Sequence, residues 1–279
     1  MFLFVDFLIL KFMSNFLISI ITINLNNLDG LKRTYYSIIN QASYDIEFIV
    51  IDGNSIDGSV DFLRSNCNLI NHLVIEKDEG IYYAMNKGAL LSSGEYLFFL
   101  NSGDELCKNA LNTIIENIKY IKSDIFYGKM YLKINKHGID SLVLMNPDLL
   151  SLKYTMSIFH PSTLIKRKIF FDIGTYNTNY KLAADYYFIL KAYTKNYRFT
   201  FLDYPFSIFE GGGFSSKNAF LSLTEGIKLK YDILPFYISI PSILQTSSKF
   251  YLSSILVKIT RMFLIKTLYF KISSKIKTL

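Results

Sequence analysis

Residues 47–58 read EFIVIDGNSIDG, an apolar run that ends abruptly in a polar loop containing two glycines. The same succession recurs on both sides of this stretch, as LISIITINLNN at 17–27 and YLFFLNSGD at 96–104. A continuous run of apolar and β-branched residues is typical of a strand that is buried on both faces in a parallel sheet. These three stretches therefore predict the kind of sheet, and the segments between them predict how its strands are connected.

Strands and helices alternate along the first half of the chain. The strands are expected at Leu17–Ile23, Glu47–Ile51, His72–Ile75 and Tyr96–Leu100. Helical segments are expected at Leu31–Gln41, Asp57–Cys67, Ile81–Leu91 and Leu106–Ile121. Strands separated by helices of this length predict an α/β fold with a mostly parallel central sheet and helices on both faces.

A polar loop follows each of the four expected strands. The loops read TINLNN at 22–27, DGNSIDG at 52–58, EKDEG at 76–80 and NSGD at 101–104. Turn formation by Asp, Asn and Gly explains each loop singly, but it explains less well why three of them carry Asp soon after an apolar strand. Ligands of open α/β sheets bind outside the carboxyl ends of the strands. The sequence therefore predicts a binding site at this edge.

The basic excess of the protein is confined to its C-terminal end. The 279 residues include 30 Lys or Arg and 23 Asp or Glu, for a net charge of +7. All acidic residues lie at or before Asp232, and residues 1–232 carry as many basic as acidic side chains. Nucleic-acid binding needs basic residues clustered on the folded body, so no nucleic-acid partner is expected. Two cysteines, Cys67 and Cys107, are too few for a disulfide framework and favour a reducing compartment.

The two ends of the chain differ from residues 16–232, which form the expected domain. Residues 1–15 begin with the apolar run MFLFVDFLILKF, which lacks the basic start and cleavage site of a signal peptide. We expect an N-terminal extension, with membrane contact as the alternative. Residues 233–279 form an expected basic, apolar, helical tail without a single acid. It fits peripheral contact with an anionic membrane surface, or a helix packed on the domain with solvated lysines.

Four longer motifs occur together in the order and spacing of a known family. They read IITINLNN, IEFIVIDGNSIDGS, EKDEGIYYAMNKGALLSSGEYLFFLNSGDEL and AADYYF. Over about residues 16–215 the chain resembles family 2 glycosyltransferases of the GT-A fold. Its DEGIYYAMNKG is similar to the pattern D-x-G-I-Y-D-A-M-N-K-G of small bacterial enzymes that build capsule, exopolysaccharide or lipopolysaccharide repeat units.

The resemblance implies a GT-A-type nucleotide-binding fold and an inverting transfer of a sugar from a UDP- or GDP-linked donor. It implies a glycan or lipid-linked glycan as the acceptor, and Mg²⁺ or Mn²⁺ as the cofactor. Together with the basic tail, it places the enzyme in the cytoplasm, at the inner face of the cytoplasmic membrane.

The resemblance assigns nucleoside recognition to the first two loops. Asp52 matches the carboxylate that reads the nucleoside, and Gly53 leaves room for close approach. The base pocket would be lined by Thr22, Asn24 and Asn26. Leu25 departs from the family, which often has Tyr at this position.

The NSGD loop occupies the position of the D-x-D metal motif of the family. Asp104 is its one acid and is the implied metal ligand, and Ser102 is an implied donor contact. A hard cation takes oxygen ligands and bridges to phosphates with few protein carboxylates. It would neutralise charge on the departing nucleoside diphosphate.

Further donor contacts are implied around the helix expected at Ile81–Leu91. Asp78 would meet donor-sugar hydroxyls, Asn86 would lie near the donor, and Lys87 would meet a phosphate. A favourable interaction of Asp78 with the helix dipole is the alternative, and an exposed helix lysine is common. Tyr83 replaces the Asp that the subgroup usually has.

The catalytic base implied by the resemblance is Asp185, in LAADYYFILKAY, which matches the acid of the family's E-D or x-D motif. An inverting transfer needs one carboxylate to take the proton of the acceptor hydroxyl. A first-turn acid at a helix start is the alternative. His160, in FHPS, falls where the family often has a His near the acceptor or the donor phosphates, with a structural role as the alternative. Glu210 and Gly211–Gly213 form either a loop that orders over the donor or a plain turn.

Three other functions compete with this interpretation. A nucleotidyltransferase would need an Arg-containing phosphate loop after the first strand, and TINLNNLDG has no Arg. A non-enzymatic membrane-associated binding protein rests on the pI of about 9.1 and the tail. A catalytically degenerate relative rests on the departures at Leu25, Tyr83 and NSGD.

Overall fold

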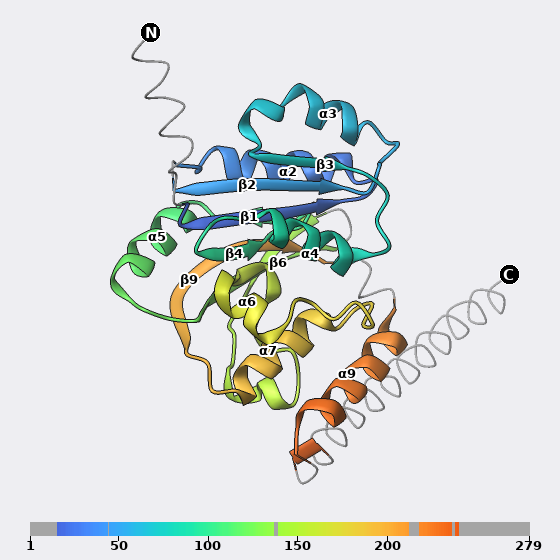
Figure 1. Cartoon of the computed structure of the whole chain (residues 1–279). Helices are drawn as coiled ribbons and strands as arrows, with labels where there is room; N and C mark the ends of the chain where they lie inside the picture. The colour runs from blue at the N-terminus through green and yellow to red at the C-terminus, as the bar shows by residue number, and fades with distance from the viewer. Residues whose placement is uncertain (1–15, 44, 137–138, 212–217, 236–237, 240–279) are drawn as a thin grey trace, which may run out of the picture.

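The computed structural model describes residues 16–43, 45–136, 139–211, 218–235 and 238–239 (Figure 1). Within these ranges nine strands form one sheet in the order β3-β2-β1-β4-β8-β6-β9-β5, with β7 paired to β6. Helices cover both faces of the sheet. The predicted α/β class of the GT-A type is confirmed.

The first half of the sheet consists of parallel strands joined by helices. Its strands are β1 (Ile18–Asn24), β2 (Ile46–Asp52), β3 (His72–Ile75) and β4 (Tyr96–Phe99). Its helices are α2 (Leu28–Ile39), α3 (Ser59–Ser65), α4 (Ile81–Leu91) and α5 (Ala110–Tyr120). β1 lies between β2 and β4 and is parallel to both, and β2 is parallel to β3. All the strands and helices predicted here are present, with ends that differ by a few residues.

Side-chain alternation along β1 divides the core into two layers. Ile18 and Ile20 pack in the layer that contains residues of α2 and α5, whereas Ile21 packs in the layer that contains residues of α4. All three side chains are fully buried. Because successive strand residues point to opposite faces and both faces are covered, the strand appears in the sequence as a mostly apolar run without alternation, in which the buried Ser19 and Thr22 are the polar residues before Asn24.

The second half of the sheet is largely antiparallel. Its strands are β5 (Glu105–Leu106), β6 (Ile125–Lys136), β7 (Ile139–Met145), β8 (Thr163–Lys166) and β9 (Phe199–Glu210). β8 is antiparallel to both β4 and β6, while β9 is parallel to β6 and antiparallel to β5. The sequence predicts none of these strands. Many side chains of the long β9 are only half-buried, so no continuous apolar run marks it.

The remaining helices pack against this half. They are α6 (Arg167–Ile173), α7 (Ala184–Thr194) and α9 (Ala219–Ile233), with the short 3-10 turns η2 (Leu150–Lys153) and η3 (His160–Ser162). A third 3-10 turn, η1 (Cys67–Leu69), belongs to the parallel half, between α3 and β3. α7 contains the AADYYF motif from the second residue of the motif on, so Asp185 stands in its first turn. η3 contacts β4, β6 and β9, and α9 lies alongside α7 (Figure 1).

Several predictions fall on other parts of the chain. The N-terminal extension at 1–15, the tail beyond residue 239 and Gly212–Gly213 lie outside the described residues. Across the ranges that the structure covers, none of the helices combines the length and the apolarity that a membrane crossing needs. Cys67 is exposed and Cys107 is buried, and both are free thiols.

Candidate functional site

The carboxyl ends of β1 and β2 lie side by side, with Asn24 opposite Asp52 in the strand register. Asn24 Nδ2 donates a hydrogen bond of 2.7 Å to Asp52 Oδ2, and the Ser55 backbone N–H donates one of 2.7 Å to Oδ1. The Ser55 hydroxyl donates a third, of 2.9 Å, to Oδ2. Asp52 is completely buried. The carboxylate predicted to read the nucleoside is thus engaged in ordering the loop that follows β2.

The two other residues predicted for the base pocket differ in exposure. Thr22 is completely buried, and its hydroxyl donates a hydrogen bond of 2.8 Å to the Leu100 carbonyl, which ties β1 to the end of β4. Thr22 therefore lies inside the sheet and not in the wall of a pocket, contrary to its predicted place. Asn26 is exposed at a backbone φ of 50°, and its Oδ1 accepts a hydrogen bond of 2.9 Å from the Ile56 N–H.

Lys87 on α4 forms ion pairs with two of the three acids in the loop after β3. Its Nζ lies 2.5 Å from Glu76 Oε1 and 2.5 Å from Asp78 Oδ1. Burial lowers the pKa of Lys87, but the hydrogen bonds to Asp78 and Glu76 outweigh burial and raise it. Asp78 and Lys87, predicted to meet a sugar and a phosphate, therefore lie in contact and neutralise each other.

Asn86 forms two hydrogen bonds with the backbone of one residue. Its Nδ2 donates to the Tyr176 carbonyl at 2.8 Å, and its Oδ1 accepts from the Tyr176 N–H at 3.0 Å. Both polar atoms of the side chain are thus occupied, and Asn86 joins α4 to the segment between α6 and α7. The structure gives this predicted donor contact a structural role.

The NSGD loop lies at the end of β4. The Ser102 N–H donates to the Ile23 carbonyl at 3.1 Å, and its own carbonyl accepts from Asn27 Nδ2 at 3.1 Å. Asp104 is only 6% exposed, and burial raises the pKa of its carboxyl from 3.8 to about 8, against backbone hydrogen bonds from Asn101 and Glu210 that lower it. Nearby Glu210 and Glu105 raise it further. Such a carboxyl is stabilised in its ionised form by a cation.

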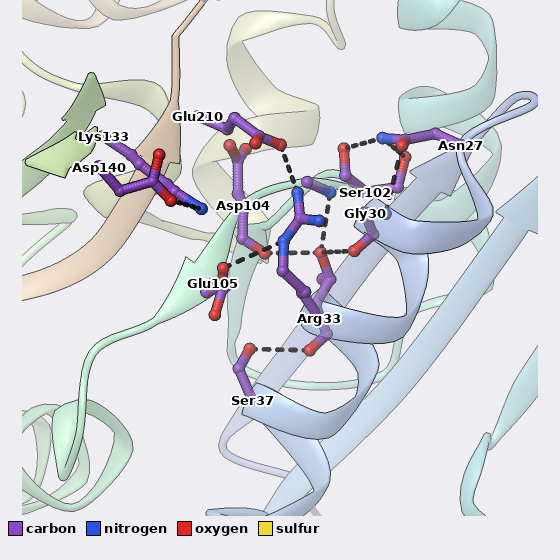
Figure 2. Close-up of polar contacts among 12 residues, drawn as sticks. Asn27, Gly30, Arg33, Ser37, Ser102, Asp104, Glu105, Lys133, Asp140 and Glu210 are labelled. Carbon is purple, nitrogen blue, oxygen red and sulfur yellow. Dashed lines mark hydrogen bonds and ion pairs between the residues drawn. The ribbon is translucent and has the colours of Figure 1, made fainter. Parts of the chain in front are cut away.

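Arg33 on α2 joins the two acids that flank Asp104 in space, as Figure 2 shows. Its guanidinium pairs with Glu210 and lies 3.3 Å from Glu105 Oε1 through Nε. Glu210 Oε2 is within 3.7 Å of where a Cβ on Gly103 would stand, so the end of β9 reaches the NSGD loop. Nothing in the sequence around Arg33 marks it, because its partners lie on strands that the sequence does not predict.

A cavity of about 260 Å³ is lined by residues from both halves of the domain. Its polar lining comes from Asn101, Asp104, His160, Lys181 and Asp185. The rest of the wall is apolar and comes from Ile81, Tyr82, Met85, Met130, Met156, Ile158, Phe159, Pro161, Leu182 and Phe209. Three predicted site residues from separate segments, namely the metal ligand, the histidine and the catalytic base, therefore line one cavity.

Asp185 and His160 are each held by neighbouring groups. Asp185 Oδ1 accepts hydrogen bonds of 2.9 Å from the Tyr82 hydroxyl and 2.9 Å from the Tyr186 N–H. His160 Nε2 lies 3.0 Å from the Tyr176 hydroxyl, and its ring stacks on Phe99 at 5.6 Å. Burial lowers the pKa of His160, and Asp185 opposes this only in part. The lowered pKa favours the neutral imidazole, which carries no charge that could meet a phosphate.

The loop after β4 suits a hard cation with few protein ligands. Among the residues that the structure describes, His, Cys, Asp and Glu side chains nowhere gather in a group of three that could hold a metal ion. Asp104 is, however, accompanied in the wall of the cavity by Asn101, whose Oδ1 is buried and has no hydrogen-bond partner. A carboxylate and an amide oxygen fit Mg²⁺ or Mn²⁺ that keeps water and phosphate ligands.

Comparisons with known proteins show which family this chain resembles. A family model described as glycosyl transferase family 2 matches residues 19–188. A PGL/p-HBAD biosynthesis glycosyltransferase of Mycobacterium tuberculosis is 30% identical over 183 residues, 63% of this chain and 69% of the relative. A poly(ribitol-phosphate) beta-N-acetylglucosaminyltransferase, TarP of Staphylococcus aureus, is 29% identical over 197 residues, 64% of this chain and 59% of the relative.

Solved structures share the fold. TarS of S. aureus, residues 1–349 in complex with UDP, superposes with a TM-score of 0.62 at 20% identity and covers 81% of this chain and 69% of its own. The mannosyltransferase PcManGT of Pyrobaculum calidifontis, in complex with GDP-Man and Mn²⁺, gives a TM-score of 0.55 at 12% identity. The match covers 85% of this chain and 75% of the PcManGT chain. The family model spans more than half of the chain, including the strand-end loops and the Asp185 helix start. This protein therefore belongs to glycosyl transferase family 2.

Proposed function

We propose that this protein is an inverting glycosyltransferase that moves a sugar from a nucleoside-diphosphate sugar to a hydroxyl of a surface glycan or glycolipid. The observation that carries the proposal is that Asp104 and Asp185 line one cavity at the carboxyl edge of the parallel strands. Two carboxylates from separate segments supply the two functions that the reaction needs. Asp104 favours a cation near the leaving group, and Asp185 accepts the proton of the acceptor.

Asp185 is the proposed catalytic base. It removes the proton of the acceptor hydroxyl while the hydroxyl oxygen attacks the anomeric carbon, and the bond from that carbon to the diphosphate breaks with release of the nucleoside diphosphate. Tyr82 and the Tyr186 N–H donate hydrogen bonds to the same oxygen, Oδ1. The second oxygen, Oδ2, accordingly remains the one that meets the acceptor.

The donor is proposed to bind over the loops after β1, β2 and β4. Asp104 and the Asn101 amide oxygen would hold Mg²⁺ or Mn²⁺, which neutralises charge on the leaving diphosphate when bound. Leu25 and Asn26, both exposed, would contact the nucleoside beside the loop that Asp52 orders. Structural neighbours in complex with UDP, UDP-GlcNAc and GDP-Man support a UDP- or GDP-linked sugar.

The acceptor is proposed to be a glycan or a lipid-linked glycan. Support comes from relatives named as a PGL/p-HBAD biosynthesis glycosyltransferase and as a poly(ribitol-phosphate) beta-N-acetylglucosaminyltransferase. The largely apolar cavity wall near Asp185 accommodates the faces of a sugar ring, which carry C–H groups. Capsule or lipopolysaccharide synthesis remains the specific setting that the sequence motifs favour.

The test of the function is transfer from a donor panel. Purified protein is assayed for release of UDP or GDP from UDP-glucose, UDP-N-acetylglucosamine and GDP-mannose with Mg²⁺ or Mn²⁺. Asp185→Asn should lower turnover by about 10²-fold or more and leave donor affinity intact, whereas the exposed Asp61→Asn on α3 should match the wild type. Undetectable binding of every donor would refute the proposal, and donor binding without turnover would identify a degenerate relative.

The tail is proposed to keep the enzyme at the inner face of the cytoplasmic membrane. Residues 249–279 hold seven Lys or Arg side chains and no acid, which favours an anionic lipid surface. Deletion of 249–279 should move the protein from the membrane fraction of lysed cells to the soluble fraction. Unchanged partitioning would refute membrane attachment by this segment.

A further inference from the structure

Glu225 on α9 binds three consecutive backbone N–H groups of the chain that leads into α7. Its Oε1 accepts from the Lys181 N–H at 2.8 Å, and its Oε2 accepts from the Leu182 and Ala183 N–H groups at 2.9 Å and 3.0 Å. The residue is only 8% exposed. A nearly buried carboxylate with three short hydrogen bonds to one segment fixes the path of that segment.

The segment held by Glu225 leads directly to the proposed base. Ala183 is the N-cap of α7 and has no side-chain capping bond of its own, and Asp185 stands in the first turn. A negative charge at this end of the helix is also favoured by the helix dipole. Lys181 and Leu182 line the same cavity as Asp185. Glu225 therefore acts on the wall of the cavity and on the helix start that carries the carboxylate.

Two further contacts attach α9 to the same region. The Tyr180 hydroxyl donates a hydrogen bond of 3.0 Å to Asp232 Oδ2 on α9. Tyr180 directly precedes the three residues that Glu225 holds. Lys230, only 1% exposed, donates to the Tyr154 carbonyl at 2.6 Å. α9 is thus attached at several points along its length, although it lies beyond residue 188, where the family match ends.

We propose that Glu225 is a positioning residue for catalysis, which holds residues 181–183 so that Asp185 meets the acceptor hydroxyl. The inference rests on the proposed role of Asp185 as the base. A carboxylate base must keep its geometry to within a fraction of the distance over which a proton is transferred, and small misplacements cost much rate. The loops proposed to bind the donor, which follow β1, β2 and β4, make none of the Glu225 contacts described above, so donor affinity should be independent of Glu225.

The test separates turnover from donor binding. Glu225→Gln preserves the size of the side chain but replaces one acceptor oxygen with an NH₂ group, which would face backbone N–H donors. We expect Glu225→Gln and Glu225→Ala to lower kcat by roughly tenfold or more, with KM and Kd for the donor within about twofold of the wild type. Thr224→Ala, on the exposed side of the same helix, is the matched control and should leave both unchanged.

The readout is release of UDP or GDP from whichever of UDP-glucose, UDP-N-acetylglucosamine or GDP-mannose the wild type turns over fastest. Hydrogen exchange of the 181–183 amides should accelerate in Glu225→Gln, while the thermal midpoint confirms folding. If Glu225→Ala does not fold, Glu225→Gln decides. A wild-type kcat in Glu225→Gln overturns the inference, as does a loss of donor affinity equal to the loss of kcat. Full turnover in Asp185→Asn would instead refute the proposed base, which keeps the two failures distinct.

Discussion

The Tyr82 hydroxyl donates a hydrogen bond of 2.9 Å to Asp185 Oδ1 across 103 positions of sequence. Tyr82 stands in the first turn of α4 and Asp185 in the first turn of α7, so the bond joins the parallel half of the domain to the half that carries the proposed base. Burial, and then the charge of Asp185, raise the pKa of Tyr82 well above its ordinary value. The phenol therefore stays protonated and remains a donor throughout the usual assay range.

Replacement of this phenol should slow the chemical step. Tyr82→Phe keeps the ring in the core but removes a hydrogen bond to a carboxylate, a class of bond worth about 1.5–3 kcal/mol. We expect kcat to fall by roughly tenfold with donor KM unchanged, as measured by nucleotide release. Tyr120→Phe, at a tyrosine that is 88% exposed, serves as the control. A fall in donor affinity without a fall in kcat would contradict a role at the base.

Asp104 should make the metal-free protein less stable at high pH. Burial raises its pKa in the folded state from 3.8 to about 8, so the folded state binds more protons than the unfolded state between these two values. The stability associated with Asp104 is therefore complete below pH about 4 and is lost as the pH rises through about 8. In a chelator, the thermal midpoint of the wild type should decline relative to that of Asp104→Asn across this range. Added Mn²⁺ should remove the decline, and parallel curves in chelator would contradict the assignment.

The positive charge of Arg33 should weaken the binding of Mn²⁺ at the neighbouring NSGD loop. Its guanidinium compensates Glu105 and Glu210, both of which lie near enough to Asp104 to raise its pKa. Arg33→Gln adds net negative charge to this region, so Mn²⁺ should bind more tightly, as isothermal titration would show. The ion pairs themselves are partly exposed, so stability in chelator should fall by no more than about 1 kcal/mol. Lys119→Gln, whose pairing with Asp45 is remote from the site, should leave Mn²⁺ affinity unchanged.

Glu47 should be required for stability and not for catalysis. It is 1% exposed and accepts hydrogen bonds from the Ser19 hydroxyl at 2.5 Å, the Ser93 N–H at 2.8 Å and the Ser93 hydroxyl at 2.9 Å. Glu47→Ala leaves these donors buried without an acceptor and should lower the free energy of unfolding by about 3 kcal/mol, as measured by urea denaturation. The exposed Glu116→Ala is the control. A loss below about 1 kcal/mol would show that water replaces the carboxylate.

The parallel half of the fold and the positions of two candidate site residues were predictable because local pattern and spatial position coincide there. A strand buried on both faces is mostly apolar, and the residues that follow its carboxyl end lie at the binding edge. Asp104 is found at such a strand end, and Asp185 at the helix start that its motif implies. Thr22 fails the same reasoning, because a polar residue near a strand end can point inward, where it bonds the Leu100 carbonyl.

The sequence by itself determined the α/β class, the order along the chain of the loops that follow the parallel strands, and the acids that stand in the family motifs. Only the tertiary structure decided which polar side chains are held by other parts of the protein. Asn86 is bound by the Tyr176 backbone, Lys87 by two acids, and Arg33 pairs with Glu210 across 177 positions. The physical reason is that hydrogen bonds and ion pairs depend on distances of a few ångströms between segments far apart in the chain. Glu225 is the clearest case, since its three backbone partners carry no signature in the sequence and are set only by the packing of α9 on α7.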